Sequence, residues 1–429
     1  MRRLLKLNFF SVVKTNTFRQ STLTFTATVI NGILGMVFYI LLARELGVFD
    51  FGLFSLSITV LAVVADIGNL GINTGIVNFV SKYLKSDYHR SMGFLKLGLL
   101  SKILIALVVI IFGFLLSPFL SKQVFNKPEL VFGLRLVFIG VGTTWLFSFT
   151  TSYYQASQKF ISWGLIQIFT NSLRLAVVVY LTASLQLNLT TAIISYIVAP
   201  LLGFLLSFVN ISVDFVKEKI NSEVRGEFFN YNKWVAISSG IAAFSSRTDI
   251  FVLGRLVTAS GIGIYSAANQ LVSVVPQLIG AMGTVVAPKY SSFTNDQQML
   301  TYFKKLLLMV VAVASFILLC TPGVRLIINQ FFGVEYRNSF PIFMVLLVAM
   351  LFFLISVPFH NAIIYYYSYP KLFSYLSVIN FIVIASLSVF LTLNFGYQST
   401  AYAIMAGNIV NFIVPALWFW RRVSGVKNK

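Results

Sequence analysis

Apolar stretches long enough to cross a bilayer recur along the whole chain, and this repetition is the strongest constraint on its fold. A membrane-spanning helix needs roughly 20 mostly apolar residues. Hydrophobic residues make up 58% of the 429 residues and charged residues only 10%, compared with about 25% charged residues in soluble domains. This composition excludes a soluble globular protein and a disordered one. It predicts an all-α membrane protein, because a helix satisfies its own backbone hydrogen bonds in lipid.

We place twelve membrane-spanning helices in the sequence. They are expected at 20–43, 52–81, 93–117, 130–153, 162–185, 189–212, 234–255, 262–287, 303–321, 341–366, 372–394 and 398–420. The longest polar stretch lies between the sixth and seventh spans and predicts a linker between two halves. The expected organisation is an N-terminal segment at 1–19, an N-lobe at 20–213, the linker at 214–233, a C-lobe at 234–420 and a tail at 421–429. For residues 1–18, an amphipathic interfacial segment and a floppy tail remain open alternatives.

The charge of the chain is strongly unbalanced, with 32 Lys and Arg against 12 Asp and Glu, a net charge of +20. Nucleic-acid binding and the positive-inside rule are two explanations of such a balance. Counted by loop parity, 22 bases lie on the side of the N-terminus, six on the opposite side and four within spans. This bias predicts that both termini are cytoplasmic. It removes the need for a nucleic-acid partner.

The two halves of the sequence resemble each other. LLARELGVFDFGLFSLS at 41–57 aligns with VLGRLVTASGIGIYSAA at 252–268 when the offset is 211 residues. In this alignment Arg44 meets Arg255 and Gly52 meets Gly263. An offset of six helices, an even number, predicts a parallel repeat, in which both halves have the same orientation in the membrane.

Several strings resemble polysaccharide flippases of the multidrug/oligosaccharidyl-lipid/polysaccharide (MOP) exporter superfamily. In the first half they are A-R-x-L-G and F-G-L-F-S within Ala43–Ser55, and V-x-K-Y at Val80–Tyr83. In the second half they are R-T-D-I-F-V-L-G at Arg247–Gly254 and G-I-Y-S-A-A at Gly263–Ala268. The resemblance implies two six-helix bundles around a V-shaped cavity that opens alternately to each membrane face, as in MATE transporters. It also implies transport of undecaprenyl-diphosphate-linked oligosaccharide repeat units to the outer leaflet of the bacterial cytoplasmic membrane.

Charged residues inside the spans are the first candidates for substrate contacts, because a charge at mid-bilayer costs roughly 2.5–3.5 kcal/mol. The four bases there outnumber the acids Asp66 and Asp249, which favours an anionic ligand such as a diphosphate headgroup. The cationic site is therefore predicted to contain Arg174, Arg247, Lys102 and Arg135. A structural ion pair within one lobe is the alternative for each of them.

Two equivalent spans, the second and the eighth, carry polar stripes at helical spacing. Asp66, Asn69 and Asn73 share one face of the second span, and Tyr265, Asn269 and Gln277 share one face of the eighth. A polar stripe on a membrane helix faces the protein interior or water. We expect these residues to line the cavity, with hydrogen-bonded contacts between helices as the alternative.

The chemistry expected of this chain is transport without an enzymatic step. One cysteine and two histidines exclude a Cys-rich or catalytic zinc site, and no nucleotide-binding P-loop is present. We expect no cofactor, with a proton or sodium ion as the candidate coupling ion at Asp66 or Asp249. Expected partners are the lipid-linked oligosaccharide, membrane lipids and polysaccharide polymerase or assembly proteins. A MATE-type exporter of small amphipathic cations and a non-transporting scaffold are the rival functions.

Overall fold

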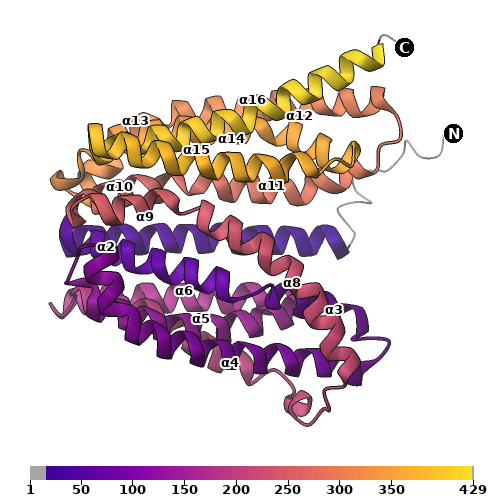
Figure 1. Ribbon diagram of the computed structural model, residues 1–429, viewed down its shortest axis with the longest axis horizontal. Coiled ribbons are helices and arrows are strands. Elements are labelled where there is room, and N and C mark those ends of the chain that lie inside the picture. The colour runs from indigo at the N-terminus through magenta and orange to yellow at the C-terminus, as the bar shows by residue number, and fades with distance from the viewer. Residues whose placement is uncertain (1–15, 428–429) are drawn as a thin grey trace. The chain divides into compact units, whose positions relative to one another are not determined.

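The protein is built from helices, as the computed structural model shows for residues 16–427 (Figure 1). The first 15 residues of the predicted N-terminal segment lie outside the described residues. The helices are α2 Asn16–Gly68, α3 Ile72–Tyr83, α4 Tyr88–Phe119, α5 Leu130–Ala156, α6 Phe160–Ala183, α7 Leu189–Phe208, α8 Ser222–Ser245, α9 Thr248–Leu256, α10 Ala259–Val272, α11 Val274–Ser291, α12 Asp296–Leu319, α13 Thr321–Ile327, α14 Ser339–Asn361, α15 Lys371–Phe395 and α16 Thr400–Lys427. Short helical turns follow some of them, including η2 Val213–Val216 and η5 Ala362–Tyr366.

Ten helices of the described chain are long and apolar enough to cross a membrane. The first of these stretches, Thr22–Gly68, has 47 residues, which corresponds to a length of roughly 70 Å. This is more than twice the hydrocarbon thickness of about 30 Å. Gly47, with φ 71° and ψ 171°, interrupts the helical backbone and divides the stretch into two spans. With α8 and α9 as one further span, the predicted all-α membrane fold of about twelve helices is confirmed.

Three predicted spans are not continuous helices, which corrects the sequence-based expectation. The second span, 52–81, is divided between α2 and α3, the seventh between α8 and α9, and the eighth between α10 and α11. In the second span Leu70 has φ 46° and Gly71 has φ 74°. A Cβ at Gly71 would also lie 2.7 Å from the Cβ of Val235. Hydropathy could not reveal these breaks, because it averages over a window of residues and contains no information on backbone dihedral angles.

The chain folds into two compact units. The first contains the chain up to Phe38 and Val60–Phe244, and the second contains Tyr39–Thr59 and Ser245–Lys429. The predicted linker at 214–233 thus belongs to the first unit, and part of the predicted N-lobe belongs to the second. The assignment of lobes to the transport cycle stays a prediction.

Within the second unit, the equivalent glycines of the internal repeat meet at one helix crossing. A Cβ at Gly52 would overlap the carbonyl oxygen of Ala259, and a Cβ at Gly263 would overlap the carbonyl oxygen of Val48. The residue pairs Val48–Ala259 and Gly52–Gly263 are both related by the 211-residue offset. The contact is therefore reciprocal. Glycine allows this approach of two backbones because it has no side chain.

Ion pairs join the start of α4, which is predicted to be cytoplasmic, to the segment that follows α7. Arg90 Nη2 lies 2.7 Å from Glu223 Oε1 and 2.8 Å from Glu227 Oε2. His89 Nδ1 lies 2.9 Å from Glu218 Oε1, and Lys96 Nζ donates to the backbone carbonyl of Glu218 at 2.8 Å. These contacts explain why the predicted linker packs with the first unit. We call them the linker clasp.

Removing the central cation of the linker clasp should measurably weaken the first unit. Arg90→Ala is expected to lower the free energy of unfolding by about 0.5–1.5 kcal/mol, since its two ion pairs are partly exposed to solvent. The loss should shrink in 1 M salt, where the Debye length falls to about 3 Å. Thermal unfolding in detergent at low and high salt measures both effects. Lys85→Ala, at an exposed position outside the clasp, is the control, and an equal shift for both variants would contradict this account of the clasp.

Candidate functional site

Lys102 is a buried cation at the break in the second span of the first unit. Its side chain comes from α4 and the residue is 1% exposed. The ammonium donates to Ser148 Oγ of α5 at 2.7 Å and to Asn69 Oδ1 at 3.3 Å. Asn69 directly follows the last residue of α2, so the ammonium lies near the negative end of that helix dipole. A third N–H of Lys102 has no acceptor among the described residues.

The break that receives Lys102 is supported by a tryptophan. Trp145 Nε1 donates to the carbonyl oxygen of Ala65 at 2.8 Å, and this oxygen also accepts the backbone N–H of Asn69 at 3.1 Å. A Cβ at Gly68 would lie 2.6 Å from the Trp145 ring. The indole therefore packs directly on the end of the helix. This arrangement fixes the position of Asn69 relative to Lys102.

Arg174 of α6 rests on aromatic rings. Its guanidinium carbon lies 3.9 Å from the ring centroid of Tyr196 on α7 and 5.7 Å from that of Phe38 on α2. The guanidinium also donates to Asn171 Oδ1 at 3.3 Å, and Asn171 Nδ2 donates to Asn31 Oδ1 at 2.8 Å. A polar and aromatic cluster from three helices therefore holds this cation inside the first unit.

Arg135 and Arg247 are the other two predicted site cations. Arg135 of α5 lies over the ring of Phe114, at 4.5 Å from its centroid. Its Nε is buried without a hydrogen-bond partner in the described structure. Arg247 belongs to the second unit and immediately precedes α9, with a non-helical backbone at φ −132°. Both side chains are half-buried.

None of these four cations forms a salt bridge with a described residue. Three of the four salt bridges of the described chain belong to the linker clasp, and the fourth joins Lys82 to Glu227 in the same unit. Arg247 interacts electrostatically with the buried carboxyl group of Asp249, and the roles of all four cations stay predictions. Aromatic faces and neutral oxygens replace carboxylates as partners of the three in the first unit. Cation–π contacts such as those of Arg135 and Arg174 contribute about 0.5–2 kcal/mol each.

Asp249 of α9 is buried in the second unit and accepts a hydrogen bond from Tyr265 of α10. Their oxygens are 2.8 Å apart, and both residues are almost fully enclosed, at 6% and 0% exposure. The sequence predicts that Tyr265 lines a cavity. In the structure its hydroxyl donates to the carboxylate of Asp249. A role for Asp249 or Asp66 in ion coupling stays a prediction.

The predicted polar stripes of the second and eighth spans do not lie on continuous helices, because each stripe crosses a helix break. Asp66 is exposed in the last turn of α2, Asn69 lies in the break, and Asn73 belongs to α3. The expectation that one uninterrupted helical face carries all three is wrong, because of the left-handed backbone at Leu70 and Gly71. In the eighth span Asn269 of α10 is half-buried and Gln277 of α11 is exposed. Whether these residues line a cavity stays a prediction.

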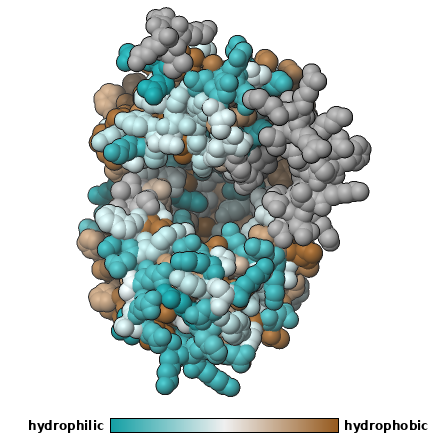
Figure 2. All heavy atoms as spheres, turned by 90° about the vertical axis from the view of Figure 1, so that its right-hand side faces the viewer, coloured by the Kyte–Doolittle hydropathy of each residue, from teal (hydrophilic) through white to brown (hydrophobic). Residues whose placement is uncertain are grey.

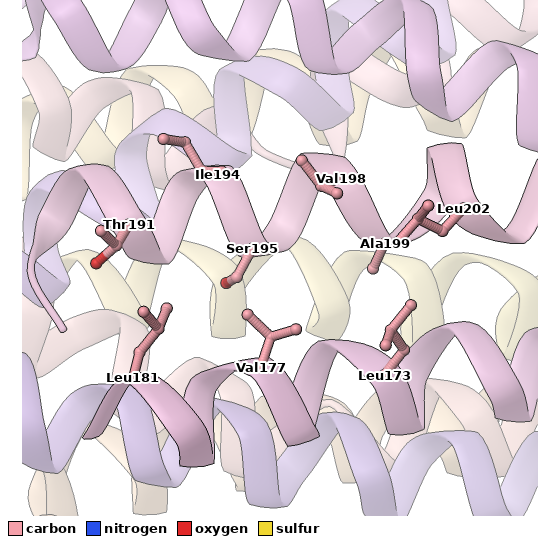
Figure 3. A pocket seen from close by; sticks show the side chains of 9 residues that line it. All are labelled: Leu173, Val177, Leu181, Thr191, Ile194, Ser195, Val198, Ala199 and Leu202. Atoms are coloured by element: carbon pink, nitrogen blue, oxygen red, sulfur yellow. The ribbon is translucent and has the colours of Figure 1, made fainter. Parts of the chain in front are cut away.

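A pocket of about 210 Å³ lies between α6 and α7 of the first unit (Figure 3). Leu173, Val177 and Leu181 of α6 face Ser195 and Ala199 of α7. The hydroxyl of Ser195 already donates to the carbonyl oxygen of Ala192 at 2.7 Å. The pocket thus offers hydrocarbon surface and suits an alkyl chain rather than a polar headgroup.

Comparison with known proteins now places the chain in a family. The model of a polysaccharide biosynthesis protein family matches residues 18–294, which is more than half of the chain. The chain belongs to this polysaccharide biosynthesis family. No curated protein matches the chain significantly by sequence. The family match covers the first unit from residue 18 onward and the second unit up to residue 294, including all four predicted site cations.

Solved structures with the same fold are transporters of the MOP superfamily. A multidrug resistance MATE family transporter in an inward-facing conformation gives a TM-score of 0.76 at 13% identity, covering 95% of this chain and 99% of that one. The lipid II flippase MurJ in an inward closed conformation gives 0.74 at 16%, covering 93% and 87%. A MOP superfamily transporter from Pyrococcus furiosus Vc1 gives 0.67 at 14%, covering 96% of both chains. At these identities the likeness establishes the fold.

The residues that contact Lys102 and Arg174 are not predicted from the sequence. Ser148, Asn31, Asn171 and Tyr196 contact Lys102 or the Arg174 cluster. Arg174 and Asn171 are three residues apart on one helix, a spacing that could have indicated their hydrogen bond. Asn31, Ser148 and Tyr196 are distant in sequence and gave no comparable signal.

Proposed function

We propose that this chain is a flippase that moves undecaprenyl-diphosphate-linked oligosaccharide repeat units from the inner to the outer leaflet for polysaccharide biosynthesis. It works by alternating access in the bacterial cytoplasmic membrane, with both termini cytoplasmic. The observation that carries this proposal is the set of four intramembrane cations without a salt bridge to any described residue. The membership of a polysaccharide biosynthesis family supports the substrate class.

The chemistry of a lipid diphosphate fits such cations. A guanidinium offers forked donors that match phosphate oxygens, and an ammonium offers three donors around a compact charge. Without substrate, Arg174 rests on Tyr196 and Phe38, so a diphosphate would replace a cation–π contact and break no ion pair. An exporter of small amphipathic cations would instead need an excess of acids in its site. The excess of cations therefore disfavours that rival despite the similarity in fold.

The function is tested by deleting the native gene in its own host and restoring it in trans, which avoids a mismatch of sugar specificity. The wild-type chain should restore surface polysaccharide and the exposure of lipid-linked repeat units at the outer leaflet. Arg174→Gln and Arg247→Gln should reduce this rescue, and Arg174→Lys should retain part of it, because the charge remains. Arg337→Gln, at an exposed loop position, is the matched control.

Two results would overturn the proposal. The first is a deletion strain that loses the export of amphipathic cations, such as ethidium, while its lipid-linked repeat units still reach the outer leaflet. The second is a deletion strain with normal surface polysaccharide. Full rescue by both arginine variants would remove Arg174 and Arg247 from the site but leave the function in place.

A further inference from the structure

The second unit has an end at which cations gather without acidic partners. Six exposed bases lie at the ends of α11, α12, α15 and α16 that point to the predicted cytoplasmic side: Lys289, Lys304, Lys305, Lys371, Arg421 and Arg422. Asp296 is the acid of this end, and its Oδ1 accepts a hydrogen bond from Tyr366 at 2.6 Å. None of the six bases forms a salt bridge with a residue that the structure describes. In the first unit, by contrast, Lys82, His89 and Arg90 pair with carboxylates.

The end of α16 combines two of these cations with an aromatic wall. A pocket of about 510 Å³ is lined there by Val414, Leu417, Trp418, Arg421 and Arg422. Trp418 stacks on Tyr369 with ring centroids 5.5 Å apart, and it meets Tyr367 edge-on at 5.6 Å. The Arg422 guanidinium lies 6.0 Å from the Tyr367 ring. Hydrophilic side chains are visible on the face of the second unit at which α16 ends (Figure 2).

The apolar, aromatic and basic residues of this pocket follow one another along α16, in the order of the acyl chain, interface and phosphate of a lipid. Val414 and Leu417 lie one to two helical turns before the arginines, toward the membrane interior, and present apolar surface. Trp418 lies at the level where aromatic residues favour the membrane–water interface. Arg421 and Arg422 lie at the terminal turns, where phosphate groups are found. An arginine guanidinium can donate two parallel hydrogen bonds to the oxygens of one phosphate. Each further cation near an anionic membrane surface strengthens the electrostatic attraction to that surface.

We propose that this basic–aromatic pocket of α16 binds the phosphate of a membrane lipid, with Arg421 and Arg422 as the phosphate ligands and Trp418 as the interfacial wall. An anionic phospholipid and the diphosphate of a carried polyprenyl lipid share this chemistry. The site depends on the chain crossing a membrane and does not depend on the proposed flippase function, so the phospholipid part of the test stands even if that function fails.

The test titrates the purified full chain in nonionic detergent with single lipids and counts retained lipids by native mass spectrometry. Phosphatidylglycerol and a polyprenyl diphosphate are the two probes, and phosphatidylcholine gives the zwitterionic baseline. The Arg421→Gln/Arg422→Gln variant should lower retention of a phosphate probe about tenfold. Trp418→Leu should lower it less. Tight retention of phosphatidylglycerol identifies a bulk phospholipid as the source, and selective retention of the polyprenyl diphosphate identifies the carried lipid.

Lys304→Gln/Lys305→Gln is the matched control, because it removes the same charge from the same end of the second unit outside the pocket. It should change retention by less than about twofold. Equal losses in the two double variants would overturn the proposal in favour of general charge attraction. Retention of phosphatidylcholine as strong as that of both phosphate probes would overturn it as well. Arg421→Lys/Arg422→Lys retains the charge, so an intermediate loss with an unchanged unfolding temperature separates ligand geometry from misfolding.

Discussion

Alanine at Gly52 or Gly263 is expected to destabilise the second unit by about 1–3 kcal/mol, the range for overpacking a close contact. A Cβ at Gly52 would overlap the carbonyl oxygen of Ala259 and lie 2.9 Å from the amide nitrogen of Gly263. The obstructing atoms belong to backbone, which cannot rotate away like a flexible side chain. The two helices would have to separate, and we expect surface-polysaccharide rescue to be lost. Thermal unfolding in detergent and the rescue assay measure the two effects.

Gly35→Ala is the matched control, because Gly35 lies in the same helix α2 with open space around its Cα. Alanine favours a helix over glycine by about 1 kcal/mol, so this variant should unfold at the same or a higher temperature. The Gly52→Ala/Gly263→Ala double variant should cost less than the sum of the two single ones, since both act on one crossing. Strict additivity, or a wild-type unfolding temperature in either single variant, would show that the crossing is not a tight backbone contact.

Lys102→Met is expected to separate stability from function. The variant removes a buried ammonium that has no carboxylate partner among the described residues. Burying a charged group has a desolvation cost of several kcal/mol, and methionine removes that cost while it fills a similar volume. We therefore expect an unfolding temperature equal to or above that of the wild type. If Lys102 serves the anionic substrate, rescue of surface polysaccharide should fall despite the higher stability, as at sites where function is retained at the expense of stability.

Ser148→Ala supplies the complementary variant. It removes the hydroxyl oxygen that accepts a hydrogen bond from the Lys102 ammonium at 2.7 Å. A buried donor without an acceptor costs about 1–3 kcal/mol. In the Lys102→Met background the same substitution should cost little, because no ammonium remains to be satisfied. A Lys102→Met variant that unfolds earlier than the wild type would show that the lysine is structural. Full rescue by a stable Lys102→Met variant would remove Lys102 from the substrate site.

The membrane class and the length of the spans could be predicted from the sequence because they are local properties. A run of about 20 apolar residues can only be placed in lipid as a helix, whatever its neighbours are. The 211-residue repeat was also visible, since it is a comparison of the sequence with itself. It paired Gly52 with Gly263, but it could not show that these two residues touch. The helix breaks at Leu70–Gly71 and at Ser246–Arg247 were hidden, because hydropathy does not report backbone dihedral angles.

The candidate site divides in the same way. That Lys102, Arg135, Arg174 and Arg247 belong to spans could be predicted from the sequence, since each stands among apolar neighbours. The sequence left open whether they are paired. The packing of the helices shows that Lys102 contacts Ser148 and Asn69, and that Arg174 contacts Asn171 and aromatic faces. The physical reason is that such partners come from helices distant in the chain, and their contact depends on how the helices pack rather than on any pattern within one helix.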